Sequence, residues 1–151
     1  MIKKIGKYEI IRELGKGATS CVYEALDPFV NRHVAIKVVF AEALGDKEHG
    51  KRYKKLFLTE ASLAGKLKHP HIVRLYGTGR HRGAPYYAME YVPGESLSEI
   101  LYRKGKLNWH EVADLSRQLC DALQHAHDNG IFHRDVKPDN IMVGNAGLVK
   151  I

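Results

Sequence analysis

The sequence predicts an α+β fold in which an antiparallel, β-rich part precedes a helical part. Short runs of β-branched and aromatic residues, separated by turn residues, fill much of residues 8–92. After Pro93-Gly94 the pattern changes, and apolar residues recur at helical spacing. We therefore expect one domain over residues 1–92 and a second over residues 93–151.

The first part is expected to contain strands joined by tight turns and a single helix. The helix is predicted over residues 51–67, because Leu56, Leu63 and Leu67 fall on one helical face before His69-Pro70. Alternating or apolar character bounded by glycine, proline and asparagine indicates five strands. These strands span residues 8–14, 21–26, 33–40, 72–76 and 85–92.

The second part is expected to begin with two helices. A capping box at residues 96–99 opens a short helix that ends near Lys104. A second cap, at residues 108–111, opens a longer helix that ends at Asn129-Gly130. Two short strands, over residues 140–143 and 148–151, complete the prediction.

The composition excludes some classes of protein and leaves others open. The chain has 151 residues, 44% hydrophobic and 27% charged, which is typical of a globular domain. A net charge of +7 suits an anionic ligand such as a nucleotide or nucleic acid. Basic residues are dispersed without interleaved aromatic residues, so we do not expect nucleic-acid binding.

Cysteine usage and hydropathy bear on where the chain resides. Cys21 and Cys120 are far apart and belong to no CxxC pair, which favours a reducing compartment and a cytoplasmic location. No stretch approaches eighteen apolar residues, and the N-terminus lacks a continuous apolar region. We expect neither a membrane segment nor a signal peptide in this chain.

A polar loop at His133–Asn140 holds the densest group of candidate catalytic side chains. It lies between two apolar runs, and Pro138 disfavours a regular element there. Asp135 is a candidate base for a hydroxyl, Lys137 can offset developing negative charge, and Asn140 can ligate a hard cation such as Mg²⁺. Any one of these residues also suits a solvated turn; the ordered set is harder to explain that way.

Lys37 and Glu60 are charges at positions where the pattern asks for apolar residues. A lone lysine in a strand commonly lies on an exposed edge, and Glu60 can reach water from the margin of its helical stripe. Alternatively, an ion pair between the two would satisfy both charges. The sequence leaves both possibilities open.

The glycine turn Gly15-Lys16-Gly17 can cradle phosphates with its backbone N–H groups, although most such turns are only tight turns. In a dinucleotide-binding fold the glycines would open a helix. Here a strand-like run begins at Cys21. The sequence therefore favours a hairpin flap over a dinucleotide-binding turn.

Taken in order, these motifs resemble the front part of a eukaryotic-type (Hanks-type) serine/threonine protein kinase domain. The matching motifs are the loop Gly15–Val22, Val34-Ala35-Ile36-Lys37, Glu60, and His133-Arg134-Asp135 through Asn140. The resemblance runs from Tyr8 to Ile151. It implies a five-stranded N-lobe with one helix, followed by the first helices and catalytic loop of an incomplete helical C-lobe.

The resemblance also implies ATP and Mg²⁺ as cofactors and a protein serine or threonine hydroxyl as acceptor. Catalytic roles would fall to Asp135, Lys137 and Asn140, with Asn140 also holding a metal ion. The residues that would bind the nucleotide are Gly15, Lys16, Gly17, Val22, Ala35, Lys37, Glu60, Met89, Glu90, Val92 and Met142.

The sequence departs from the family pattern at two places. Ser20 replaces the third glycine of the loop, a mild change. Residue 151 falls just before the expected Asp-Phe-Gly motif, whose aspartate carries the main Mg²⁺. We therefore expect these 151 residues alone to have little or no kinase activity. The alternative is a truncated, pseudokinase-like module that binds nucleotide or a partner without catalysis.

An exposed apolar face on the helix over residues 108–129 predicts self-association.

Overall fold

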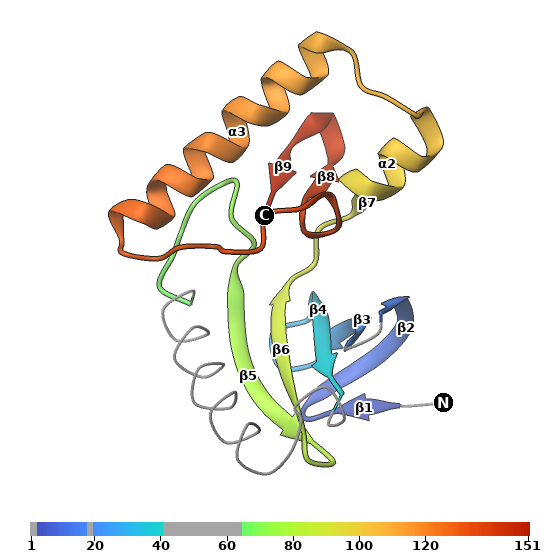
Figure 1. Cartoon of the computed structure of the whole chain (residues 1–151). Helices are drawn as coiled ribbons and strands as arrows, with labels where there is room; N and C mark the ends of the chain where they lie inside the picture. The colour runs from blue at the N-terminus through green and yellow to red at the C-terminus, as the bar shows by residue number, and fades with distance from the viewer. Residues whose placement is uncertain (1–2, 18–19, 41–64) are drawn as a thin grey trace. The chain divides into compact units, whose positions relative to one another are not determined.

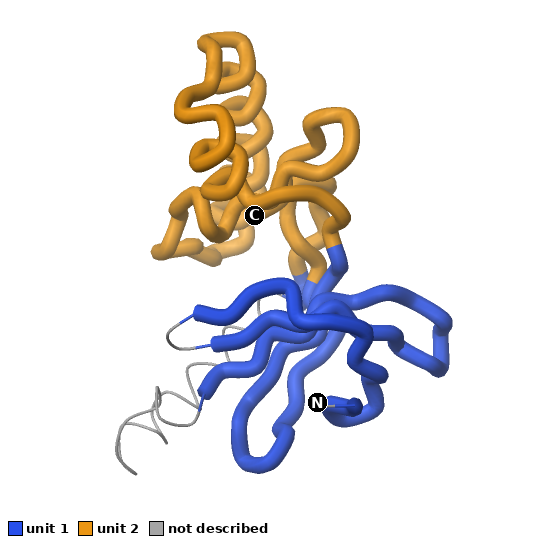
Figure 2. The backbone as a smooth tube through the Cα atoms, turned by 90° about the vertical axis from the view of Figure 1, so that its right-hand side faces the viewer, with its two compact units in different colours: residues 1–66, 75–91 blue, residues 67–74, 92–151 orange. Residues whose placement is uncertain are grey.

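The computed structural model of the chain describes residues 3–17, 20–40 and 65–151. The chain forms two compact units, coloured separately in Figure 2. The first comprises residues 1–66 and 75–91, and the second comprises residues 67–74 and 92–151. The predicted helix over residues 51–67, with Glu60, lies outside the described residues except at positions 65–67.

The first unit is built on an antiparallel sheet (Figure 1) with the strand order β1-β2-β3-β4-β6-β5. Five strands were expected, and the two-residue β1 adds a sixth. Every pair in the sheet is antiparallel, and the pairs β1–β2, β2–β3, β3–β4 and β5–β6 join strands that are consecutive in the chain. The strands are β1 (Lys4–Ile5), β2 (Tyr8–Lys16), β3 (Ser20–Asp27), β4 (Arg32–Val39), β5 (Leu75–His81) and β6 (Ala84–Glu90).

One face of this sheet forms the core of the first unit. Because strand side chains alternate between faces, alternate residues of β3, β4 and β6 bury together. The ring of Tyr8 meets that of Tyr86 edge to face, with centroids 6.2 Å apart. The buried cluster contains Ile5, Tyr8, Ala25, Val34, Ile36, Tyr86 and Ala88.

The strand predicted over residues 72–76 was misplaced. The Ile72 N–H donates to the His69 carbonyl, and the Val73 N–H donates to the Ile151 carbonyl, so this segment pairs locally and with the C-terminal residues. Strand β5 therefore begins only at Leu75. Gly77 and Gly79 lie inside β5, and the hairpin turn is Arg82-Gly83, both at positive φ.

The second unit combines two helices with a small antiparallel sheet of order β7-β8-β9. Its strands are β7 (Gly94–Ser96), β8 (Met142–Gly144) and β9 (Val149–Lys150), and its helices are α2 (Leu97–Lys104) and α3 (Trp109–Asp128). Leu97, Ile141 and Val149 form its buried core. Gln118 ties α3 to the β8–β9 hairpin, because its side chain accepts from the Val149 N–H at 2.8 Å and donates to the Gly147 carbonyl at 3.0 Å.

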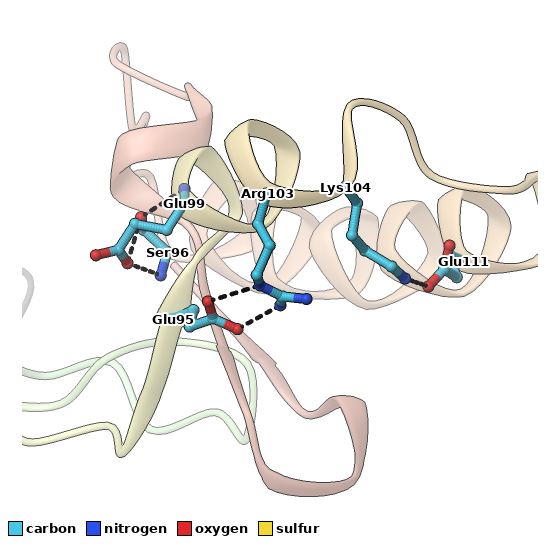
Figure 3. A network of polar contacts seen from close by, with 6 residues as sticks. All are labelled: Glu95, Ser96, Glu99, Arg103, Lys104 and Glu111. Carbon is cyan, nitrogen blue, oxygen red and sulfur yellow. Dashed lines mark hydrogen bonds and ion pairs between the residues drawn. The ribbon is translucent and has the colours of Figure 1, made fainter.

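Both helix starts follow the predicted capping chemistry. The Ser96 side chain accepts from the Glu99 N–H, and the Glu99 carboxylate accepts from the Ser96 N–H (Figure 3). Asn108 and Glu111 form the same reciprocal pair at the start of α3. Satisfying the free N–H groups in this way fixes where each helix begins.

The apolar face of α3 is partly covered. Leu115 and Leu119 pack against the core of the second unit, whereas Trp109, at the first turn, is 71% exposed. Self-association through this face stays a prediction. Among the described residues, no helix is long and apolar enough to cross a membrane.

Candidate functional site

The sheet register of the first unit brings the sequence-predicted residues together on one face. Residues directly opposite one another on antiparallel strands project to the same side, as do residues two apart on one strand. Two adjacent rows result. One row contains Gly15, Val22, Lys37 and Tyr87, and the other contains Arg12, Glu24, Ala35 and Met89. We call this surface the second face of the sheet, because the core occupies the first.

Lys37 does not lie on an edge strand. Its strand, β4, is hydrogen-bonded to β3 on one side and to β6 on the other, and Lys37 faces Val22 and Tyr87. The lysine is partly buried, so its charge needs an anionic partner or access to water. The edge-strand alternative is therefore excluded. The predicted pairing with Glu60 lies outside the described residues and is untested.

The glycine turn closes a hairpin between β2 and β3. The Gly17 N–H donates to the Ser20 carbonyl at 2.8 Å, and a strand follows the turn. This order of elements confirms the hairpin and excludes the dinucleotide-binding alternative.

Neither Gly15 nor Gly17 is required by the described packing. A Cβ at Gly15 would meet no atom within 4 Å, and one at Gly17 would only touch the Ser20 carbonyl at 3.7 Å. Neither residue has a positive φ. Glycines that the fold does not need fit a loop whose backbone is approached closely by a ligand.

The second candidate group lies in the loop of the second unit. The Lys137 ammonium is 3.1 Å from Asp135 Oδ2. The Asn140 side-chain amide donates to the same oxygen at 2.9 Å and to the Asp135 carbonyl at 2.8 Å. Three residues predicted to act together are thus joined around one carboxylate.

Backbone contacts fix the C-terminal end of this loop. The Asn140 N–H donates to the Lys137 carbonyl and closes a 3₁₀ turn over Pro138–Asn140. Directly afterwards, the buried Ile141 accepts from the Leu97 N–H through its carbonyl. Arg134 has a φ of 62°, a left-handed conformation that costs a non-glycine residue about 1–2 kcal/mol. The loop is therefore held in one shape by its surroundings.

The carboxylate of Asp135 is held in its charged form. Hydrogen bonds from Lys137 and then from Asn140 lower the pKa of Asp135 below its ordinary value. Partial burial lowers the pKa of His133, which favours the neutral imidazole. The neutral ring in turn lets His133 Nδ1 accept the Asp135 N–H at 3.3 Å.

The remaining predicted residues lie at the ends of strands. Glu90 ends β6 opposite Val34, and Met142 begins β8 opposite Ser96. Lys16 ends β2, with its ammonium 5.8 Å from the centre of the Phe40 ring. Val92, partly buried, belongs to the second unit.

One residue on the second face was not singled out from the sequence. Glu24 is a buried carboxylate in the row of Ala35 and Met89. Its signal was available, because a glutamate between Val22 and Leu26 falls at a position of strand alternation that is otherwise apolar.

Asn140 offers one side-chain atom that could ligate Mg²⁺. Because the Asn140 amide nitrogen is committed to Asp135, its Oδ1 is the atom left to ligate a hard cation. Among the described residues, no group of three or more His, Cys, Asp or Glu side chains is arranged to hold a metal ion.

Comparison with known proteins gives a consistent result. The model of the protein kinase domain matches residues 8–151. A probable serine/threonine-protein kinase of Clostridium acetobutylicum is 39% identical over 96% of the chain, and the serine/threonine-protein kinase PrkC of Bacillus subtilis is 38% identical over 97%. The chain spans 22% of the length of each.

Solved structures agree on the fold. The kinase domain of Mycobacterium tuberculosis PknI superposes with a TM-score of 0.87 at 27% identity, covering all of this chain and 61% of that one. The apo form of PpkA-294 gives a TM-score of 0.84 at 23% identity, over 97% of this chain and 58% of that one. Both support the α+β arrangement expected from the sequence.

A prediction follows for the acid titration of Asp135. Lys137→Met removes the largest cause of the lowered pKa, so the pKa of Asp135 should rise toward its ordinary 3.8. In the wild type, the stabilisation from this carboxylate is present above that ordinary value and is lost as the pH falls through the lower folded-state pKa. An NMR titration of the side-chain carboxyl signal measures the pKa of Asp135 in the wild type and in Lys137→Met.

The control for this titration is Lys106→Met, which makes the same change in net charge at an exposed position in another loop. It should leave the pKa of Asp135 unchanged. Equal pKa values for Asp135 in the wild type and in Lys137→Met would contradict the assigned cause.

Proposed function

The chain belongs to the protein kinase domain family, and on that premise we propose that it binds ATP and acts in phosphoryl transfer to serine or threonine hydroxyls of protein substrates. The observation that carries the proposal is the second face of the sheet, which gathers Gly15, Val22, Ala35, Lys37 and Met89 through strand register alone. The sequence similarity to bacterial serine/threonine-protein kinases supports serine and threonine hydroxyls as the phosphoryl acceptors.

The nucleotide would bind at the second face. Val22 and Ala35 offer short apolar side chains suited to a flat adenine ring, with Met142 as a third contact and Met89 behind. Backbone groups at Glu90 and Val92 would hydrogen-bond the adenine edge. The assignments of Val22, Ala35 and Met89 rest on the strand register and on the family resemblance. Those of Met142, Glu90 and Val92 rest on the family resemblance.

Charge neutralisation would come from Lys37 and from the glycine loop. Lys37 lies in the row that begins at Gly15, so its ammonium and the loop's N–H groups belong to one end of the face. An ammonium and backbone N–H groups are the donors that phosphates require. Lys16 adds a second cation at the loop, and Glu60 remains the proposed partner of Lys37.

The loop of the second unit would position the acceptor hydroxyl. A carboxylate with a lowered pKa is a weak base, so Asp135 would chiefly orient the hydroxyl and accept its proton late in the transfer. Lys137, 3.1 Å from that carboxylate, would offset negative charge that develops beside it.

Asn140 would contribute one metal ligand through its Oδ1. Its amide nitrogen is tied to Asp135, so the metal ligand and the hydroxyl-orienting carboxylate are held as one rigid pair. When bound, Mg²⁺ supplies neutralisation of the phosphate oxygens.

A cytoplasmic location is also part of the proposal. It is supported by Cys21 and Cys120, which are both free thiols, as proteins kept in a reducing compartment usually have.

We predict that Gly15→Ala weakens nucleotide binding without unfolding the protein. The new methyl group meets no atom of the described residues within 4 Å, so we attribute a loss of affinity to the approach of the ligand. The affinity for a non-hydrolysable ATP analogue with Mg²⁺, measured by calorimetry, should fall about tenfold, which corresponds to about 1.4 kcal/mol.

The matched control is Gly77→Ala, a glycine inside β5 whose added Cβ would touch only the Tyr8 hydroxyl at 3.9 Å. It should retain the wild-type affinity. Equal affinities for Gly15→Ala and Gly77→Ala, or no binding by the wild type, would contradict the proposed site.

We further predict that Asp135→Asn abolishes most phosphoryl transfer by the full-length protein while nucleotide affinity is preserved. Losing the group that orients the hydroxyl should lower kcat by roughly 10²–10⁴. Transfer of radiolabelled phosphate to a protein substrate measures the rate. The charge-matched control is Asp128→Asn, at the exposed end of α3, which should keep full activity. Nucleotide binding with no transfer by the wild type would instead favour the non-catalytic module.

A further inference from the structure

The second face of the sheet carries a buried carboxylate that the proposed chemistry does not use. Glu24 is only 7% exposed and lies directly opposite Ala35, two residues along β3 from Val22. A buried carboxylate is costly unless it is paired and hydrogen-bonded. The partners of Glu24 therefore indicate what it holds in place.

Both oxygens of Glu24 are engaged, and their partners come from the two neighbouring strands. Arg12 Nε on β2 donates to Glu24 Oε2 at 2.8 Å. His33 Nδ1 on β4 lies 2.9 Å from Glu24 Oε1. The carboxylate thus joins three strands at the row that contains Ala35.

Arg12 extends this group to the residue that follows β6. Its Nη2 donates to the Tyr91 hydroxyl at 3.2 Å. The His33 ring lies beside the Tyr91 ring, with centroids 6.2 Å apart and planes tilted by 39°. Tyr91 stands between Glu90 and Val92, the two residues whose backbone is proposed to bind the adenine edge.

Of the residues in this group, Glu24 is the one that holds the others in place. The Arg12 side chain is more than half exposed, so an arginine–tyrosine hydrogen bond alone would hold a mobile group weakly. The buried carboxylate fixes the planar guanidinium through Nε and leaves Nη2 directed to the tyrosine hydroxyl. The Tyr91 side chain is therefore held in place by Glu24 and Arg12, two residues of the sheet.

We propose that Glu24 is a positioning residue for adenine recognition, acting through Arg12 on Tyr91 and so on the backbone at residues 90–92. The inference rests on the proposed function and assigns the base and the phosphates of the nucleotide to different residues. Glu24 supports recognition of the base, whereas Lys37 and the glycine loop recognise the phosphates. A change at Glu24 should weaken the binding of adenosine and leave the binding of inorganic triphosphate unchanged.

The test compares these two probes on the full-length protein by calorimetry. Glu24→Gln keeps the side-chain volume and removes the charge, so adenosine affinity should fall roughly three- to tenfold, the net worth of a typical hydrogen bond. Tyr91→Phe, which removes only the hydroxyl, should give part of this loss. The double variant should lose less than the sum of the two single losses.

The matched control is Glu9→Gln, which breaks an exposed ion pair with Lys4 on β1 and should change neither affinity. Equal losses of adenosine and triphosphate affinity in Glu24→Gln, or a lowered melting temperature with both affinities unchanged, would overturn the proposal and leave Glu24 a stabilising residue. Full adenosine affinity in Tyr91→Phe would overturn it as well, and that variant avoids any question of folding.

Failure of the proposed function is distinguishable from failure of this inference. Were the wild type to bind neither probe, the nucleotide site itself would be wrong. The NMR signals of the Tyr91 ring, compared between wild type and Glu24→Gln, then decide the positioning contact. A shifted or broadened signal supports it, and an unchanged signal overturns it.

Discussion

The antiparallel register of the first unit is the constraint on which the rest of the structure depends. Strand alternation allows each residue only one face, so a single register decides the surroundings of every side chain in the sheet. Val34 and Ile36 join the buried core. Ala35 and Lys37, their neighbours in sequence, must then project to the opposite side. A slip of one residue would bury Lys37 in the core and expose Ile36.

The second face is therefore an outcome of core formation. Burial of Ala25, Val34, Ile36 and Ala88 fixes the strands in register. The same register aligns a glycine, a valine and a lysine from three strands in one row. These residues are far apart in sequence, and the register makes them neighbours. Contacts between them are not needed to stabilise the fold, because burial of the core side chains already does so.

The loop of the second unit follows a different physical logic, because it has no regular element to position its side chains. Here the charged groups organise one another: Lys137 and Asn140 converge on Asp135, and the buried Ile141 anchors the segment that follows. The left-handed backbone at Arg134 is tolerated inside this arrangement. Strain at a loop that is held by its surroundings is common at functional sites.

Much of this could be predicted from the sequence, where local chemistry determines the outcome. The helix starts at Ser96 and Asn108 followed from side chains three residues apart. The hairpin at the glycine loop followed from a strand on either side. Each of these features depends on a few neighbouring residues, which a linear pattern records.

Features set by long-range pairing were harder to predict. Strand β5 was placed too early, because the Val73 N–H donates to the carbonyl of Ile151, a residue distant in sequence. The role of Glu24 was missed, because the sequence shows a lone acid in a strand and does not show Arg12 and His33 on either side of it. That Lys37 lies on an internal strand likewise required the order of the strands, since the lone lysine equally suited an edge.

The most direct test of the account is which face of the sheet responds to nucleotide. Methyl NMR spectra would be recorded during titration with a non-hydrolysable ATP analogue and Mg²⁺. The account predicts that the methyl signals of Val22 and Ala35 shift, while those of Val34, Ile36 and Ala88 on the core face stay in place. Shifts confined to the core face, or no shift at Val22 and Ala35 at saturating analogue, would contradict it.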